Sequence, residues 1–282
     1  MHRLLRTALW TLGGLAASGL ALRVRRAAED RRADRLERDL FAAPSAPPRF
    51  TDALVADLPE PARRYLRHAI APGTPLAPAV RLALEGTMTP TPGGAPVELT
   101  ADEVLAPRRG FVWTARARMA GLPVRVRDRY AADDGGVRVH LLGLLPLPSS
   151  AEQDDVARSS RGRLVGEAVW CPTALLGPGV TWEAVDADRA RFSLTVDGEA
   201  VAVTLRIGAD GALREVTLDR WGDVGVDHFQ PIPYGFAVEG EGTFGGVTIP
   251  TRIRGGWWYG TDRFDAAAAA SFVVTGARFA GD

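Results

Sequence analysis

FVWTARARM (residues 111–119) and VRVRDRY (residues 124–130) decide the fold of this chain. In both stretches apolar side chains occupy nearly every second position, and arginine fills many of the positions between them. A period of two is typical of β-strands with one buried and one solvent-exposed face. Strands that are buried on both faces are apolar throughout, so this pattern predicts an antiparallel sheet.

The same alternation recurs at 190–197, 201–207 and 247–253, and the turn sequences at 133–136, 197–199 and 210–211 predict hairpins. Further strands are expected at 80–88, 97–105, 137–142, 180–186, 213–221 and 271–279. We therefore predict a mainly β (α+β) domain: a large curved antiparallel sheet or half-barrel of about ten strands, joined mostly as a meander.

Helices are expected to cover the apolar face of this sheet, since an exposed apolar face must be buried. A helical lead-in is predicted at 52–70, where apolar residues recur at helical spacing after Pro61. A second helix is predicted at 160–170 and a short turn at 172–176, preceded by an apolar loop at 143–148.

The N-terminus is a candidate membrane anchor. Residues 8–22 are apolar and uncharged, a length that suits a signal sequence or a short spanning helix. An uncleaved anchor is favoured over a cleaved signal because no small-residue cleavage site follows the run. We expect a cell-membrane protein with a single N-terminal anchor. Arginines on both sides of the apolar run leave the side of the main domain open.

The chain divides into three parts by composition. Residues 1–41 are expected to form the anchor and a charged, solvated helix, and residues 42–50 a Pro-rich linker. Residues 51–282 are expected to form a single β-rich domain, with the helical lead-in at its start and a helical insert near 158–177.

Composition excludes several functions. The chain has 282 residues with 34 basic and 34 acidic side chains, and it contains no lysine. A balanced charge argues against nucleic acid as a partner, and the absence of lysine excludes Schiff-base chemistry and a P-loop. Cys171 is the only cysteine, so no intrachain disulfide can form, and its apolar neighbours predict a structural thiol with a raised pKa. No metal site, cofactor or catalytic residue is predicted.

Aromatic content points instead to an apolar ligand. The chain has seven tryptophans, and a curved sheet that helices cover only in part can enclose a cavity with aromatic walls. The hypothesis is a membrane-anchored module that binds a hydrophobic small molecule or lipid. The expected ligand-binding residues are Trp113, Arg129, Glu167, Trp170, Leu175, Trp182, Trp221 and Phe236.

Two alternatives stay open. An enzyme, a hydrolase or isomerase, could use the carboxylates of Glu167, Glu239 or Glu241 with Arg220, which would require at least two of these residues to meet in a pocket. A scaffold without ligand would instead have a fully packed apolar face.

Four sequence motifs resemble an uncharacterised bacterial domain family over about residues 55–280: E-x-V-W-x-P-x-A-L-L at 167–176, L-P-x-x-x-R-x-Y-L at 58–66, R-W-G at 220–222 and G-T-F-G-G-x-T-I-P at 242–250. The resemblance implies no activity. The strand-rich layout is also similar in architecture to the half-barrels of the LolA/LolB and LppX/LprG lipid or lipoprotein carriers, which are exported proteins.

Overall fold

The first strand of the sheet, β1 (Val80–Met88), pairs with the last, β13 (Ala270–Phe279), and this pairing joins two antiparallel meanders side by side. The computed structural model describes residues 22–90, 93–147 and 153–281. Its sheet has thirteen strands in the order β6-β5-β4-β3-β2-β1-β13-β12-β11-β10-β9-β8-β7. The first meander continues through β2 (Val97–Ala106), β3 (Gly110–Met119), β4 (Leu122–Ala131), β5 (Asp134–Leu141) and β6 (Leu145–Leu147). The second contains β7 (Val180–Ala184), β8 (Arg189–Val196), β9 (Glu199–Ile207), β10 (Leu213–Gly222), β11 (Gln230–Phe244) and β12 (Val247–Trp257).

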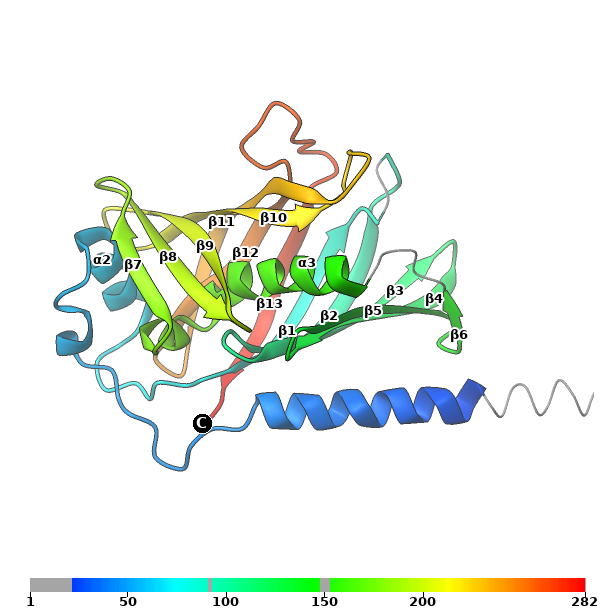
Figure 1. Ribbon diagram of the computed structural model, residues 1–282, viewed down its shortest axis with the longest axis horizontal. Helices are drawn as coiled ribbons and strands as arrows, with labels where there is room; N and C mark the ends of the chain where they lie inside the picture. Colours follow the sequence, from blue (N-terminus) through cyan, green and yellow to red (C-terminus); the bar gives the residue numbers. More distant parts are fainter. Residues whose placement is uncertain (1–21, 91–92, 148–152, 282) are drawn as a thin grey trace, which may run out of the picture.

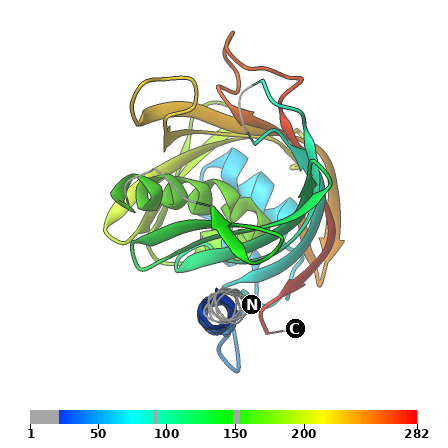
Figure 2. The same cartoon turned by 90° about the vertical axis from the view of Figure 1, so that its right-hand side faces the viewer.

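The connection between the two meanders places helices inside the curved sheet. β6 and β7 form opposite edges, so the chain has to cross from one edge to the other. It does so through α3 (Gln153–Gly166) and the 3-10 helices η2 (Glu167–Trp170) and η3 (Pro172–Leu176). Figures 1 and 2 show α3 lying within the curve of the sheet. The sheet is therefore a half-barrel whose concave face is covered by its own crossover, as the sequence predicts.

The main core lies between the concave face and these helices. Trp170 of η2 stacks on Phe236 of β11 with ring centroids 5.7 Å apart, and its indole Nε1 donates to the carbonyl of Pro250 at 2.9 Å. Gly135 allows α3 to approach β5, because a Cβ on this residue would lie 2.7 Å from the Cα of Ala157. Burial of large apolar side chains on this scale is the main source of stability for a sheet of this kind.

One end of the half-barrel is closed by η1 (Asp52–Val55) and α2 (Glu60–Ala69), which occupy the region of the predicted lead-in. The apolar stripe of α2 is buried as predicted and packs against β7, β8 and β12. Its other side carries arginines, of which Arg64 pairs with Glu60 at 2.6 Å and Asp188 at 3.2 Å.

Helix 22–40 lies against the convex face of the sheet (Figure 1), whereas the sequence predicts a solvated helix. Ala33 and Leu40 are buried in a second apolar cluster with Val104 and Val112, whose side chains point away from the main core. Arg109 donates to the last carbonyls of the helix, including that of Asp39 at 2.9 Å. The convex face is thus partly covered, because some of its positions between the arginines are apolar.

Two strands of the sheet, β11 and β6, were not predicted from the sequence. β11 contains two prolines and three glycines and has irregular register near Gly240, features that weaken a strand pattern. β6 occupies the predicted apolar loop, where a short edge strand tolerates Pro146. No helix among the described residues is long and apolar enough to cross a membrane. Residues 8–21 of the expected anchor lie outside the described residues.

Candidate functional site

Arg163 of α3 is the centre of a cluster of buried charges on the concave face. Its Nε donates to Glu167 Oε1 at 2.8 Å and its Nη1 to Asp128 Oδ2 at 2.8 Å. Its Nη2 donates to Glu103 Oε1 at 3.3 Å. The guanidinium carbon also lies 4.7 Å from the ring centroid of Phe111 and 5.1 Å from that of Trp113. We call Arg163, Glu103, Asp128 and Glu167 the carboxylate cluster.

Strand register explains why these residues meet. Glu103 of β2 lies opposite Trp113 of β3, and Trp113 lies opposite Asp128 of β4. Asp128 in turn lies opposite Val137 of β5. Directly opposed residues share a face of the sheet, so the four side chains form a row across the concave face. α3 crosses above this row and supplies the arginine.

Burial makes the carboxylate cluster electrostatically unusual. Glu103 is only 2% exposed. Its burial, followed by the negative charge of Glu167, raises the pKa of the Glu103 carboxyl well above its ordinary value, although Arg163 opposes this shift. The surrounding carboxylates raise the pKa of Arg163 despite its burial. Glu103 therefore holds its proton more tightly than a solvated glutamic acid and can act as a hydrogen-bond donor.

Two buried oxygens of the cluster have no hydrogen-bond partner among the described residues: Asp128 Oδ1 and Glu167 Oε2. A buried carboxylate oxygen without a donor costs about 1–3 kcal/mol or more. Both atoms are hydrogen-bond acceptors inside the cluster, and the Glu103 carboxyl hydrogen-bonds with Glu167.

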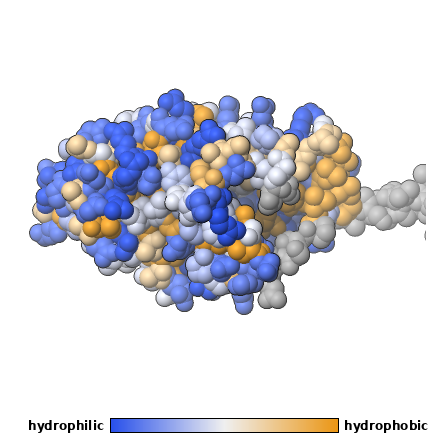
Figure 3. Space-filling view, turned by 90° about the horizontal axis from the view of Figure 1, so that it is seen from above, coloured by the Kyte–Doolittle hydropathy of each residue, from blue (hydrophilic) through white to orange (hydrophobic). Residues whose placement is uncertain are grey.

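An apolar surface extends from the carboxylate cluster toward the sheet edge. It consists of Val124, Val126, Val137, Val139, Leu141, Leu145 and Leu147, which we call the apolar floor. Val126 lies opposite Val139, which lies opposite Leu147, and Val137 lies opposite Asp128, so the floor shares the concave face with the cluster. Leu145 and Leu147 are 45% and 49% exposed. Figure 3 shows apolar side chains gathered at this end of the molecule.

The predicted ligand-binding residues fall into separate groups. Trp113 and Glu167 meet at Arg163, which brings them into one site. Trp170 and Phe236 stack in the core, as described above. Leu175 and Trp182 meet on the side of α2, where the Trp182 indole donates to the Leu175 carbonyl at 3.2 Å.

Trp221 and Arg129 lie apart from the carboxylate cluster. The indole of Trp221 donates to Asp155 of α3 at 2.8 Å, and Arg158 stacks on its ring at 3.7 Å. Arg129 points to the convex face, where it pairs with Asp134 at 2.8 Å, because it alternates with Asp128 along β4. The eight residues therefore do not form one cavity wall.

The carboxylates of the enzyme alternative are also dispersed. Glu239 is exposed, and Glu241 contacts His68 Nε2 at 2.9 Å and accepts from the backbone of Leu213 at 3.0 Å. Glu167 alone joins the carboxylate cluster. Arg220 lies over Tyr234 and Trp257, with its guanidinium carbon 5.0 and 4.8 Å from their ring centroids.

Sequence reasoning missed Glu103 and Asp128 as site residues, although a signal for them exists. Both occupy positions in the apolar phase of an alternating strand: Glu103 follows Leu99 and Ala101, and Asp128 follows Val126. A carboxylate at a buried strand position requires a partner. Arg163 could not be identified as that partner because it lies on a separate helix.

Cys171 is buried, and its burial raises the pKa of the thiol to about 12, as the sequence predicts for a structural cysteine. The Cys171 sulfur lies 3.6 Å from the carbonyl oxygen of Ala77. In the part of the chain that the structure describes, no three His, Cys, Asp or Glu side chains are placed to hold a metal ion.

Solved structures with a similar layout include a LolA superfamily protein from Nitrosomonas europaea, with 9% identity and a TM-score of 0.38 over 78% of this chain and 91% of that chain. A DUF1329 family protein from Desulfovibrio piger matches with 11% identity and a TM-score of 0.34 over 72% and 86%. A domain from Vibrio parahaemolyticus, described as an outer membrane lipoprotein-sorting protein, matches with 6% identity and a TM-score of 0.33 over 71% and 85%. The LolA-type likeness expected from the sequence is thus present among the matches.

No curated protein matches the chain. The sequence pattern of one family matches residues 48–269, and its description is a family of unknown function, DUF6544. This range includes every strand from β1 to β12 and the whole carboxylate cluster. The chain belongs to the DUF6544 family.

Proposed function

We propose that this protein is a membrane-anchored module that binds an amphipathic, lipid-like ligand on the apolar floor. The observation that supports this proposal best is the continuity of the floor with the carboxylate cluster on one concave face. A ligand there would cover exposed apolar side chains and reach buried polar atoms at the same time.

The apolar end of the ligand would lie on β4, β5 and β6. Exposed apolar surface bordered by polar groups is typical of interaction sites. Each Å² of apolar surface removed from water contributes about 25 cal/mol, so an acyl chain covering Leu145, Leu147 and Val137 would gain several kcal/mol.

The polar end of the ligand would meet the carboxylate cluster. Asp128 Oδ1 and Glu167 Oε2 are acceptors without a partner among the described residues. Glu103, whose pKa is raised, supplies a donor. A head group with a hydroxyl or amide donor fits this arrangement, because the oxygens without a partner accept hydrogen bonds while Arg163 and the buried Arg220 balance the charges of Asp128 and Glu167.

Membrane attachment through the N-terminal segment is part of the proposal. The apolar run of residues 8–22 ends at the first described residue of helix 22–40. The first turns of this helix lie beside the turn between β5 and β6, since a Cβ on Gly143 would come within 3.2 Å of Arg26 Nη1. The anchor would thus emerge at the end of the molecule where the apolar floor is exposed.

Photochemical labelling of the full chain in nanodiscs tests this site. A fatty alcohol carrying a diazirine on its chain is added, the sample is irradiated, and labelled peptides are identified by mass spectrometry. We expect labels within 124–147 in the wild type and a loss of at least tenfold in the variant L145N/L147N.

The matched control is V185N/V273N, which changes two apolar side chains that are 38% and 40% exposed, one just after β7 and one on β13. It should label as the wild type does. Labels spread evenly over the chain, or an equal loss in both variants, would refute the proposed site.

A further inference from the structure

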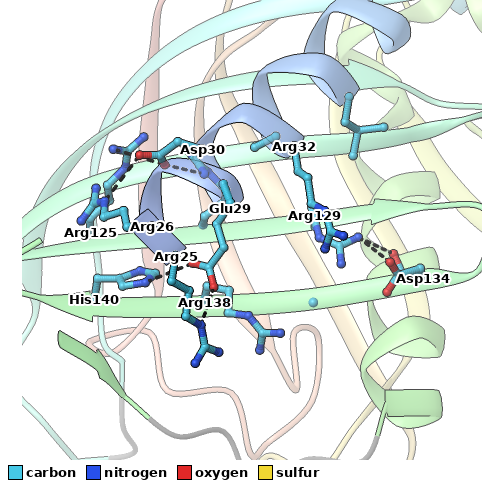
Figure 4. A pocket seen from close by; sticks show the side chains of 15 residues that line it. Arg25, Arg26, Glu29, Asp30, Arg32, Arg125, Arg129, Asp134, Arg138 and His140 are labelled. Carbon is cyan, nitrogen blue, oxygen red and sulfur yellow. Dashed lines mark hydrogen bonds and ion pairs between the residues drawn. The ribbon is translucent and has the colours of Figure 1, made fainter. Parts of the chain in front are cut away.

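A hollow lies on the opposite, convex side of the sheet, between helix 22–40 and strands β4 and β5 (Figure 4). Its volume is about 640 Å³, which is in the usual range for small-molecule sites. Fifteen residues line it, of which seven are arginines and three are carboxylates. With His140 neutral, the lining has an excess of four positive charges.

The strands place these arginines next to one another. Arg127 of β4 lies directly opposite Arg138 of β5, and Arg125 lies opposite both Arg116 and His140. Like charges at directly opposed positions are destabilising. Stability of the sheet therefore does not explain why these arginines lie on adjacent strands.

Carboxylates from helix 22–40 neutralise only part of the charge. Asp30 pairs with Arg127 at 2.8 Å, with Arg26 at 3.5 Å and more distantly with Arg125 at 3.9 Å. Glu29 lies 3.4 Å from both Arg25 and His140. These contacts fix the helix on the sheet, yet they leave guanidinium groups without a partner.

The arginines of the hollow that these carboxylates do not neutralise indicate a site for an anion. Arg32 and Arg138 are exposed, make no hydrogen bond or ion pair with any residue that the structure describes, and both line the hollow. The Nε of Arg125 is buried without an acceptor among the described residues. Burial, followed by the charge of Arg127, lowers the pKa of Arg125, which is the direction expected where positive charges crowd together.

We propose that this hollow binds a phosphate-type anion through Arg32, Arg125 and Arg138. Guanidinium groups bind phosphate oxygens in pairs of parallel hydrogen bonds, and these three arginines border the same hollow from helix 22–40, β4 and β5. The phosphate can come from an anionic phospholipid head group or from a soluble phosphate compound. The hollow lies beside the first turns of helix 22–40, immediately after the apolar residues 8–22, which places it where a head group would be.

Binding to the full chain in non-ionic detergent tests the proposal and separates the two sources. Phosphatidylglycerol, phosphatidylcholine and inorganic phosphate are titrated separately by isothermal calorimetry. We expect saturable binding of phosphatidylglycerol over phosphatidylcholine if the source is a lipid, and of inorganic phosphate if it is soluble.

The variant R32A/R138A should weaken binding at least tenfold, because it removes two of the three proposed contacts and breaks no ion pair. The control R206A/R214A removes the same charge from exposed positions outside the hollow and should bind as the wild type does. Binding of neither anion, equal binding of phosphatidylcholine, or an equal loss in both variants would overturn the proposal. This result is independent of ligand binding on the concave face.

Discussion

Glu103 and Arg163 lie within 3.3 Å of each other, yet the pKa of the glutamic acid is raised rather than lowered. Arg163 is shared among three carboxylates, so its charge cannot compensate each of them. Burial and the charge of Glu167 dominate at Glu103. The arrangement favours the protonated form of the Glu103 carboxyl inside the half-barrel, beside the exposed apolar floor.

The raised pKa predicts a pH dependence of stability. Folded Glu103 retains its proton at pH values at which the unfolded chain has released it, so unfolding releases a proton. The contribution of Glu103 to the free energy of unfolding should therefore be highest below the ordinary pKa of about 4.5 and fall as pH rises through the folded pKa, by up to about 1.4 kcal/mol per pH unit.

Glu103→Gln should remove this decline while leaving the unfolding free energy at pH 7.5 equal to or above that of the wild type. Denaturant unfolding at a series of pH values measures both. The exposed Glu98→Gln on the same strand is the control and should keep the wild-type profile. An unchanged pH profile in Glu103→Gln would show that another group causes the decline.

Arg163→Met should destabilise the protein by about 3–5 kcal/mol, because it leaves buried carboxylates without a counter-charge. Arg129→Met, which breaks one exposed ion pair with Asp134, should cost about 0–1 kcal/mol. Urea unfolding compares the two variants. A similar small cost in both would contradict the buried character of the cluster.

Gly135→Ala should destabilise the protein by about 1–3 kcal/mol, since its Cβ would meet the backbone of α3 at 2.7 Å. At the neighbouring Gly136 the nearest atom would be a flexible Arg129 nitrogen at 3.8 Å, so Gly136→Ala should be close to neutral. Thermal unfolding of the pair checks how tightly the crossover helix lies on β5. Equal midpoints would argue against this contact.

Ala33→Asp should release helix 22–40 from the convex face, because Ala33 is 3% exposed and contacts the second apolar cluster. Hydrogen exchange should then increase by about tenfold or more in residues 22–40 and stay unchanged in β8 and β9. Val24→Asp, at a side chain of the same helix that is 59% exposed, should leave exchange unchanged. Protection that survives in Ala33→Asp would place the helix in solution without a docked face.

Most strands could be predicted because a strand with one buried and one exposed face alternates apolar and polar residues along the sequence. β1 has the predicted bounds, and β4 alternates as predicted between Val126 or Tyr130 on one face and Arg127 on the other. β11 was not predicted because glycines and prolines interrupt the alternation of apolar and polar residues along its fifteen residues.

The candidate site was less predictable because it depends on contacts distant in sequence. Arg163 is 60 residues from Glu103, and only the crossover of α3 brings them together. Arg129 and Asp128 are neighbours in sequence but point to opposite faces, so Arg129 belongs with the convex surface. Tryptophans gave little guidance, since Trp170 fills the core as a large apolar side chain does in any protein.

Native mass spectrometry of the full chain after mild detergent extraction tests the central claim most directly. Wild-type protein should carry a co-purifying amphipathic molecule at about one per chain, and L145N/L147N should lose most of it while V185N/V273N retains it. A wild-type spectrum that contains only the bare chain, or a molecule retained equally in all three proteins, would contradict binding on the apolar floor.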